Sequence, residues 1–136
     1  MSVLVVVAEA EEIKLIPRAY KDLPVLVAGV GAKMLDTLLN IDPSVDVVVN
    51  VGYCGSKELP IGTIVYEPEC ETVDDFAEGE NYPITEGKVL DMENRWLERW
   101  CNKHDVGLKV IKVVSDNLSY VQYKKTLKKG EVWDEK

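Results

Sequence analysis

Short runs of β-branched and other apolar residues recur along the chain and predict a series of β-strands. The first run, Val3 to Val7, is continuous rather than alternating, which is typical of a strand buried on both faces of a parallel sheet. Similar runs follow at residues 25–28, 45–51, 61–66, 88–90 and 108–114. We therefore expect most of these strands to share one buried sheet.

Several segments between these runs have the spacing of amphipathic helices. Residues 10–20 place Ile13, Ile16 and Tyr20 on one side, and residues 32–40 group methionine and leucine in the same way. The clearest apolar stripe runs through residues 92–104, and we interpret it as core packing. This stripe consists of Met92, Trp96, Leu97, Trp100 and Cys101. Residues 123–136 are predicted to form a polar helix or tail.

Strands that alternate with helices predict an α/β fold, a three-layer domain with a mostly parallel central sheet and helices on both faces. A chain of 136 residues, 46% of them hydrophobic, can bury one sizeable core, so we expect a single domain over residues 1–136. Ligands of such sheets bind outside the carboxyl ends of the strands. Candidate chemistry is therefore sought where each predicted strand ends.

The acidic charge of the chain is local. Its formal net charge is -8, and residues 67–86 alone carry eight Asp or Glu and no Lys or Arg. Such a run is usually a solvated loop, and a net acidic chain without a basic stripe is not expected to bind nucleic acid. The apolar run at the start of the chain is far shorter than a membrane span, and the cysteines form no CxxC pair. We expect a cytoplasmic protein with no metal and no cofactor.

Polar or glycine-containing segments follow several predicted strands, and each has an ordinary structural explanation. Glu9, Glu11 and Glu12 are acids that would stabilise the first turn of a helix. Asp91 and Ser115 could be helix N-caps. Gly29-Val30-Gly31 lacks the third glycine of a dinucleotide-binding fingerprint, so it is a weak match to that motif. It could instead be a tight turn from strand to helix. Gly52 and Gly55 would close a buried strand, where glycine permits a positive φ and leaves backbone N–H groups open to an anion or hydroxyl.

The order of these segments is more specific than any one of them. AEAEEI, AGVGAK, NVGYCGS, LPIGTIV, LDMEN and KVVSDN follow one another over nearly the whole chain. This succession resembles the motifs of the purine nucleoside phosphorylase superfamily. The closest likeness is to the methylthioadenosine and adenosylhomocysteine nucleosidases. The resemblance implies a phosphorylase- and hydrolase-like fold, a small nucleoside as ligand and an assembly of identical subunits.

The resemblance also implies roles for individual residues. Asp116 matches the general acid that protonates the leaving purine, and Glu12 matches the carboxylate that orients or deprotonates the attacking water. Glu93 matches the acid that accepts hydrogen bonds from the ribose hydroxyls, and Met92 would pack against the sugar. Further substrate-binding positions would be Gly52, Tyr53, Ser115 and Asn117.

Departures from the family pattern leave alternatives open. Asn50 stands where the family's phosphorylases carry a phosphate-binding arginine, so hydrolysis is expected ahead of phosphate-dependent cleavage. Tyr53 replaces a small serine, and the segment between LPIGTIV and DMEN is much shorter than in the family. A relative that binds a nucleoside or another protein without catalysis is therefore the first alternative. A phosphate-dependent nucleoside phosphorylase is the second.

Overall fold

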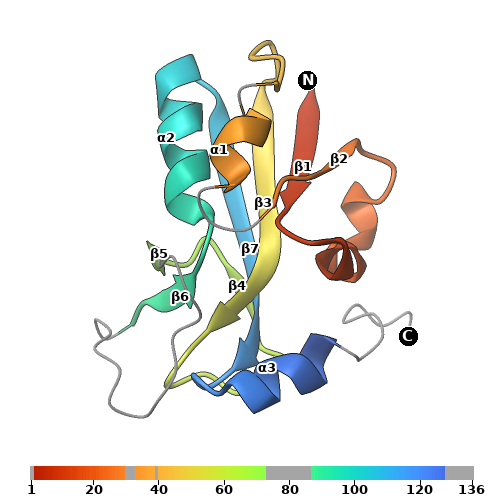
Figure 1. Cartoon of the computed structure of the whole chain (residues 1–136). Coiled ribbons are helices and arrows are strands. Elements are labelled where there is room, and N and C mark those ends of the chain that lie inside the picture. Colours follow the sequence, from red (N-terminus) through yellow and green to blue (C-terminus); the bar gives the residue numbers. More distant parts are fainter. Residues whose placement is uncertain (1, 30–32, 39, 73–86, 128–136) are drawn as a thin grey trace.

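The computed structural model describes residues 2–29, 33–38, 40–72 and 87–127. In chain order the elements are β1 (Val3–Val7), the 3-10 helices η1 (Ala10–Leu15) and η2 (Arg18–Tyr20), β2 (Val25–Val27), α1 (Lys33–Leu38), β3 (Val47–Gly55), β4 (Ile64–Tyr66), β5 (Cys70–Thr72), β6 (Val89–Asp91), α2 (Asn94–His104), β7 (Gly107–Asp116) and α3 (Tyr120–Leu127). Figure 1 shows the long strands β3 and β7 side by side through the middle of the molecule.

The sheet is mostly parallel and is organised around β3. Strands β1 and β7 flank β3 and run parallel to it, and β2 runs parallel to β1 on its outer side. The short strand β4 lies antiparallel beside β7, and β6 meets the end of β3 in antiparallel pairing. This arrangement confirms the predicted α/β class with its mostly parallel sheet.

Alternation along β3 divides the core into two layers. Val49, Val51 and Tyr53 point to the face that η1 covers, where they pack with Leu15 and Ile16. Val48 points to the other face, where α1 and α2 pack with residues such as Met34 and Leu97. Figure 1 shows α1 and α2 on one side of the sheet and the 3-10 segment on the other. The predicted three layers are therefore present, although 3-10 helices replace an α-helix on one face.

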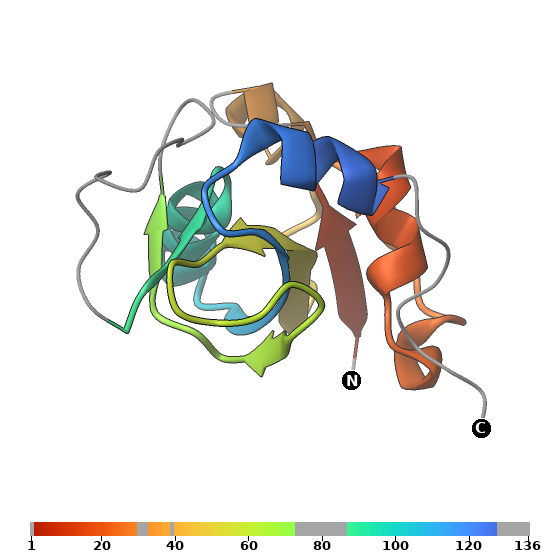
Figure 2. The same ribbon diagram turned by 90° about the horizontal axis from the view of Figure 1, so that it is seen from below.

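A small third core lies at the carboxyl end of the sheet. There β6 pairs with β3 through Gly55 and Leu90, and β5 extends this edge parallel to β6. On the other side of β3, β4 lies beside β7. These strands together curl around a small apolar cluster of Cys54, Val89 and Val114. Figure 2 shows this curl from the end of the molecule where α3 crosses the sheet. The curl brings β5 and β6, which lie late in the chain order, next to the end of β3.

The helix predicted over residues 10–20 was wrong in type. Two short 3-10 helices occupy this segment and are separated at Pro17, which has no N–H and whose ring clashes with the preceding helical turn. Ile13 was expected on the buried side, but it is 44% exposed. Among the described residues, no helix combines the length and the apolar character needed to cross a bilayer.

Other predictions needed smaller corrections. Strand β3 continues past residue 51, so Gly52 lies inside the strand, whereas Gly55 is its last residue, as expected. Helix α2 begins at Asn94, which leaves Met92 before the helix, and β5 was not expected. Strand β2 lies at the edge of the sheet with Val25 and Val27 exposed, contrary to burial on both faces. Most of the acidic run (73–86), Val30, Gly31 and the end of the predicted tail (128–136) lie outside the described residues.

The end of α2 generates a stability prediction. Asp105 closes this helix in the left-handed region, with φ 54° and ψ 43°, and the next N–H, of Val106, bonds to the carbonyl of Cys101 at 2.8 Å. Glycine adopts this conformation without a Cβ penalty. We expect Asp105→Gly to stabilise the fold by about 0.5–1 kcal/mol, or about 2–4 °C in thermal denaturation. Asp105→Ala is the control and should lower the melting temperature; a less stable glycine variant would contradict this account.

Candidate functional site

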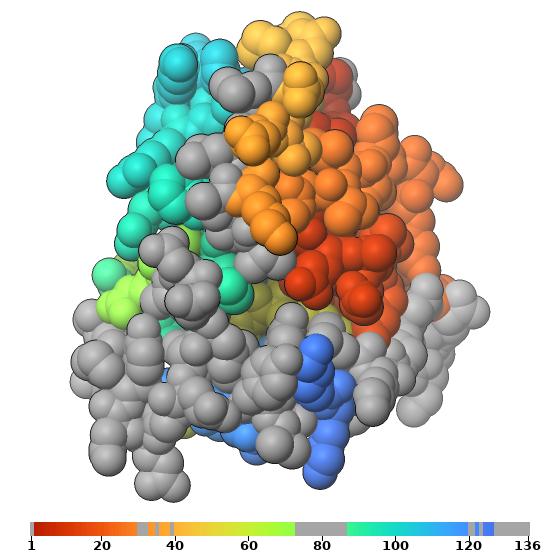
Figure 3. Space-filling model, in the orientation of Figure 1, coloured from red at the N-terminus to blue at the C-terminus, as the bar shows by residue number. Residues whose placement is uncertain are grey.

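A gap along one edge of β3 creates the candidate site. Strand β1 pairs with β3 only as far as Val6 and Asn50, and β6 joins the same strand only at Gly55. Between these points the N–H of Tyr53 donates to Glu12 Oε2 at 2.8 Å instead of to a strand. In the space-filling view, atoms of β3 are visible at the bottom of a hollow bordered by η1 and α3 (Figure 3). The gap lies at the carboxyl ends of parallel strands, where ligands of α/β sheets bind.

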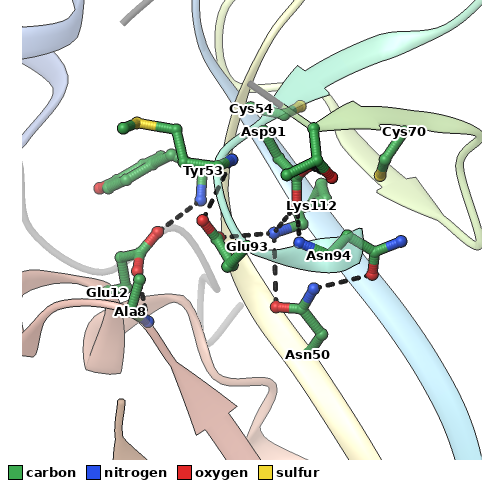
Figure 4. A network of polar contacts seen from close by, with 12 residues as sticks. Ala8, Glu12, Asn50, Tyr53, Cys54, Cys70, Asp91, Glu93, Asn94 and Lys112 are labelled. Atoms are coloured by element: carbon green, nitrogen blue, oxygen red, sulfur yellow. Dashed lines mark hydrogen bonds and ion pairs between the residues drawn. The ribbon is translucent and has the colours of Figure 1, made fainter. Parts of the chain in front are cut away.

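The start of η1 fixes the carboxylate of Glu12. Its Oε1 accepts the backbone N–H groups of Ala8 at 2.9 Å and Glu9 at 3.1 Å, as part of a capping box. Its Oε2 reaches across to Tyr53 (Figure 4). Glu9 is partly buried and takes part in the capping box, and Glu11 is exposed, whereas Glu12 is 6% exposed. Stabilisation of the first turn therefore explains Glu9 and Glu11 but not the burial of Glu12.

The end of β6 supplies two further buried carboxylates. Glu93 Oε2 accepts the N–H of Met92 at 3.2 Å, and its Oε1 accepts a hydrogen from Lys112 Nζ at 2.8 Å. Asp91 Oδ2 accepts, at 2.8 Å, the N–H of Asn94, which is the first residue of α2. Asp91 Oδ1 accepts a hydrogen bond from the hydroxyl of Thr72, also at 2.8 Å. The N-cap of α2 is therefore Glu93 and not Asp91, although Asp91 accepts the N–H of the first helical residue; Asp91 also faces the same ammonium group as Glu93.

Lys112 is a residue of the candidate site that the sequence analysis missed. It lies in the middle of β7 with 0% exposure, and its Nζ lies 2.8 Å from Glu93 Oε1, 3.2 Å from Asp91 Oδ2 and 3.3 Å from Asn50 Oδ1. A lysine between valine and isoleucine in a buried strand could have revealed it, because a charge at such a position must be paired. Figure 4 shows its ammonium at the centre of the cluster.

Gly52 leaves room for this cluster. A Cβ at Gly52 would lie 2.7 Å from Glu12 Oε2, 3.0 Å from Glu93 Oε1 and 3.2 Å from Lys112 Nζ. The expected reason for this glycine was a positive φ, but among the described residues the glycines with positive φ are Gly29, Gly62 and Gly87. Close approach of three charged side chains therefore explains the glycine, and the backbone conformation does not.

Burial and mutual repulsion change the acidity of these groups. Burial, together with the neighbouring Glu93 carboxylate, raises the pKa of Glu12 to about 8, although Lys112 and the backbone N–H groups oppose the change. Burial also raises the pKa of Glu93, against the effect of Lys112. Burial alone would lower the pKa of Lys112, but Glu93 and Asp91 hold it well above its usual value. The lysine therefore stays charged, and the pKa values of both Glu12 and Glu93 lie above the ordinary glutamate value.

Asp116 stands apart from this cluster at the end of β7. Its Oδ2 lies 3.3 Å from the position that a Cβ on Gly55 would occupy. Gly55 in turn lies about 10 Å beyond Gly52 along β3. Asp116 Oδ1 accepts the Ser115 hydroxyl at 2.6 Å, and its Oδ2 accepts the N–H of Leu118 at 2.9 Å. Burial raises the pKa of Asp116 against these hydrogen bonds.

The remaining predicted site residues have structural contacts of their own. Ser115 lies within β7 and does not cap a helix, because its hydroxyl bonds to Asp116. Both amide hydrogens of Asn117 bond to backbone carbonyls, those of Ser56 at 2.7 Å and Leu59 at 2.9 Å. The Tyr53 ring belongs to the apolar core on the η1 face. The structure thus gathers Glu12, Glu93 and Gly52 at one point, with Asp116 apart from them at the end of β7, beside Gly55. Met92, between Asp91 and Glu93, is partly buried.

Comparison with known proteins identifies the fold. No protein-family model and no curated protein matches this sequence. The 5′-methylthioadenosine/S-adenosylhomocysteine nucleosidase of Helicobacter pylori matches at TM-score 0.76 and 15% identity, covering 96% of this chain and 92% of that chain. The corresponding nucleosidase of Colwellia psychrerythraea, solved with adenine, matches at TM-score 0.74 and 18% identity, with coverage of 93% and 88%. Futalosine hydrolase of Helicobacter pylori matches at 0.75 and 14%, with coverage of 96% and 92%. The structural neighbours thus confirm the fold of the nucleoside phosphorylase and nucleosidase superfamily that the motifs predicted.

The space at Gly52 can be tested directly. A methyl group there must displace the Glu12 and Glu93 carboxylates, so we expect Gly52→Ala to lower the free energy of unfolding by about 1–3 kcal/mol. Gly107→Ala is the matched control in β7, where the nearest atoms to a Cβ lie at 3.4 Å, and it should change stability by less than about 0.5 kcal/mol. Urea denaturation measures both. Equal effects of the two substitutions would show that Gly52 is not needed for close approach.

The role of Lys112 predicts a pH-dependent loss of stability. Lys112→Met leaves Asp91 and Glu93 buried without their cation, and we expect it to cost about 3–5 kcal/mol at pH 7. In the variant, loss of the Lys112 charge raises the pKa of Glu93 in the folded state further above its value in the unfolded state. The variant therefore loses stability as pH rises from the unfolded-state pKa through the folded-state pKa of Glu93. The loss relative to the unchanged protein should therefore be smaller at pH 5 than at pH 8. Lys109→Met, at an exposed position of the same strand, is the control. A loss independent of pH would contradict the ion-pair account.

Proposed function

We propose that this protein hydrolyses the N-glycosidic bond of a purine nucleoside or thionucleoside. The observation that carries the proposal is the meeting of Glu12, Glu93 and Lys112 at the bare Cα of Gly52, with Asp116 at the end of the neighbouring strand β7, beside Gly55. Its structural neighbours are nucleosidases and a futalosine hydrolase, which supports a nucleoside ligand at fold level. The unit that acts would be residues 1–136 as a single domain, in an assembly of identical subunits.

Glu93 is the proposed ligand of the ribose hydroxyls. A carboxylate accepts hydrogen bonds from a diol strongly when it is ionised, and the contact at 2.8 Å with Lys112 favours that ionised form. Hydrolysis of such a bond develops positive charge on the sugar, which a carboxylate stabilises in a buried site. Met92, next to Glu93 in the chain, would contact the sugar face.

Glu12 is the proposed base for the attacking water. Three backbone N–H groups hold its carboxylate in one orientation, which is what a positioned base needs. In the proposed reaction a water adds to the sugar carbon C1′ and passes a proton to Glu12. The bond from C1′ to the purine nitrogen breaks, and the free sugar and free base are the products. A pKa of about 8 places Glu12 near the working range of a general base.

Asp116 is the proposed acid for the leaving purine. A purine anion leaves poorly, so a proton delivered to its five-membered ring lowers the barrier. Burial raises the pKa of Asp116, which favours the protonated form needed for this step. Ser115, bonded to the same carboxyl group, would fix its orientation, and Asn117, Gly52 and Tyr53 would complete the substrate-binding surface.

The charges of the cluster favour water over phosphate as the nucleophile. Lys112 is the cation that the structure places among these carboxylates, and its ammonium is already engaged, because it donates to Glu93 and Asn50 and forms an ion pair with Asp91. These contacts direct its charge toward the protein's own acids rather than toward a phosphate oxygen. Three carboxyl groups with one ammonium would also repel a phosphate dianion.

A nucleoside-binding protein without turnover is the second candidate. The observation that favours it is the raised pKa of Glu12, about 8, since a carboxyl group that is largely protonated at pH 7 cannot accept a proton from water. The first hypothesis requires activity that increases with pH. The second requires binding without release of the base at any pH.

A base-release assay tests the proposal. The protein is incubated with a panel of purine nucleosides, including methylthioadenosine, with and without phosphate, and the free base is measured from pH 5 to 9. We expect release without phosphate that increases through a limb near pH 8, where Glu12 loses its proton. Glu12→Gln should remove this limb and lower the rate by about 10²–10⁴-fold, and Asp116→Asn by a similar factor.

Glu93→Gln and an exposed control complete the design. Loss of the charge-assisted bonds to ribose should lower kcat/KM by about 10–100-fold. Glu98→Gln, on the exposed side of α2, should leave the rate unchanged. Release that requires phosphate would refute the hydrolytic branch, and calorimetric binding without release at any pH would establish the second candidate.

A further inference from the structure

Asn50 and Asn94 form a buried amide pair behind the carboxylate cluster. The Nδ2 of Asn50 donates to Asn94 Oδ1 at 3.0 Å, and the Oδ1 of Asn50 accepts a hydrogen from Lys112 Nζ at 3.3 Å. Asn50 is fully buried in β3, and Asn94 is the buried first residue of α2. The pair therefore connects the central strand, the first turn of α2 and the lysine (Figure 4).

The two contacts fix the direction of the Asn50 amide. Lys112 carries only donors, so the amide oxygen of Asn50 must face it and the amide NH2 must face away. Asn94 accepts from that NH2, which makes the reverse orientation unfavourable. The hydrogen bonds to Asn94 and Lys112 are therefore sufficient to point the amide oxygen of Asn50 at the ammonium group.

The Asn50 oxygen completes the coordination of the ammonium group. Lys112 donates hydrogen bonds to Glu93 at 2.8 Å and to Asn50 at 3.3 Å, and its ammonium forms an ion pair with Asp91 at 3.2 Å. A buried ammonium hydrogen without an acceptor costs about 1–3 kcal/mol or more, so the lysine would otherwise shift away from this position. Position 50 therefore helps to determine where the lysine charge lies relative to Glu93.

A neutral acceptor suits this position. Three carboxyl groups, those of Glu12, Glu93 and Asp91, already share one ammonium. An aspartate at position 50 would offer a similar oxygen but would add a fourth acid that competes for the same cation. The amide supplies the acceptor without the charge.

We propose that Asn50, oriented by Asn94, is a positioning residue that holds Lys112 against Glu93 and so keeps Glu93 available to the ribose hydroxyls. This inference rests on the proposed function for its ribose step. Its structural part, the placement of the lysine charge, can be tested in the protein without substrate.

Titratable groups face Lys112 from each strand and helix packed around it. Glu12 approaches from η1, Asp91 and Glu93 from the end of β6, and Cys54 and Cys70 from β3 and β5. Burial raises the pKa of Cys70 to about 12 and moves that of Cys54 still higher, so both thiols remain neutral from pH 5 to 9. The carboxyl groups are thus the ones whose titration reports on the lysine.

The first test compares single-charge substitutions in the whole chain. Asn50→Asp places a carboxylate against Lys112, and Asn94→Asp keeps the acceptor for Asn50 while placing the charge one hydrogen bond further away. Asn102→Asp adds the same charge at an exposed position of α2. Carbon-13 NMR follows the titration of the Glu93 carboxyl group. We expect an upward shift of about one pH unit or more for Asn50→Asp, a smaller one for Asn94→Asp and none for Asn102→Asp.

Catalysis gives the second measurement. In Asn50→Asp the KM for the nucleoside should increase by about tenfold or more at pH 7 and recover at higher pH as Glu93 ionises again, whereas a structural defect would not recover. Asn102→Asp, at an exposed position of α2, should leave KM unchanged. Unchanged titration of Glu93 in a folded Asn50→Asp protein would overturn the inference. Absence of base release by the unchanged protein would instead refute the proposed function and leave the titration to decide this one.

A third variant covers a failure of Asn50→Asp to fold. Asn50→Ser keeps a shorter oxygen that cannot reach the ammonium at the same distance, and nitrogen-15 NMR can follow hydrogen exchange at Lys112 Nζ. We expect exchange at least about tenfold faster than in the unchanged protein, because the ammonium hydrogen donated to Asn50 loses its acceptor. Asn102→Ser, at an exposed position of α2, is the matched control. Equal exchange in the serine variant and in the unchanged protein would show that Asn50 does not hold the lysine.

Discussion

One buried ammonium group determines how this site is built. Lys112 lies inside the sheet without exposure, and its contacts with Glu93, Asp91 and Asn50 link β7, β6 and β3. Buried charges are tolerated only when they are paired and hydrogen-bonded, so each of these groups needs the others. The same cation partly offsets the repulsion between Glu93 and Glu12, which allows two carboxyl groups to share the space beside Gly52.

The sheet geometry explains why the site lies where it does. Strand β3 is longer than β1, so its edge beyond Asn50 has no strand partner until β6 arrives at Gly55. In that interval the backbone N–H of Tyr53 donates to Glu12. The gap in strand pairing thus becomes the place where the fold holds a buried carboxylate, within the candidate site.

Sequence patterns predicted much of the fold and part of the site. Continuous valine runs such as Val3–Val7 identified the parallel strands, but the 3-10 geometry after Glu9 depends on Pro17 and on tertiary packing that periodicity does not show. Glu12 and Glu93 were found only through the order of motifs, because their proximity arises from strand pairing far apart in the chain. Lys112 was missed because its place beside Gly52, on the same face of the sheet as Asn50, follows only from the register between β3 and β7. Strand register is set by the whole sheet and cannot be obtained from one segment.

The central claim is that burial and mutual repulsion at Gly52 keep Glu12 protonated at neutral pH. The most direct test is a carbon-13 NMR titration of the Glu12 carboxyl group in the unchanged protein without ligand. The account predicts a transition near pH 8, coupled to a change in the Glu93 signal. A transition near the ordinary glutamate value of about 4 would show that the two carboxyl groups do not share a buried site, and would contradict the account.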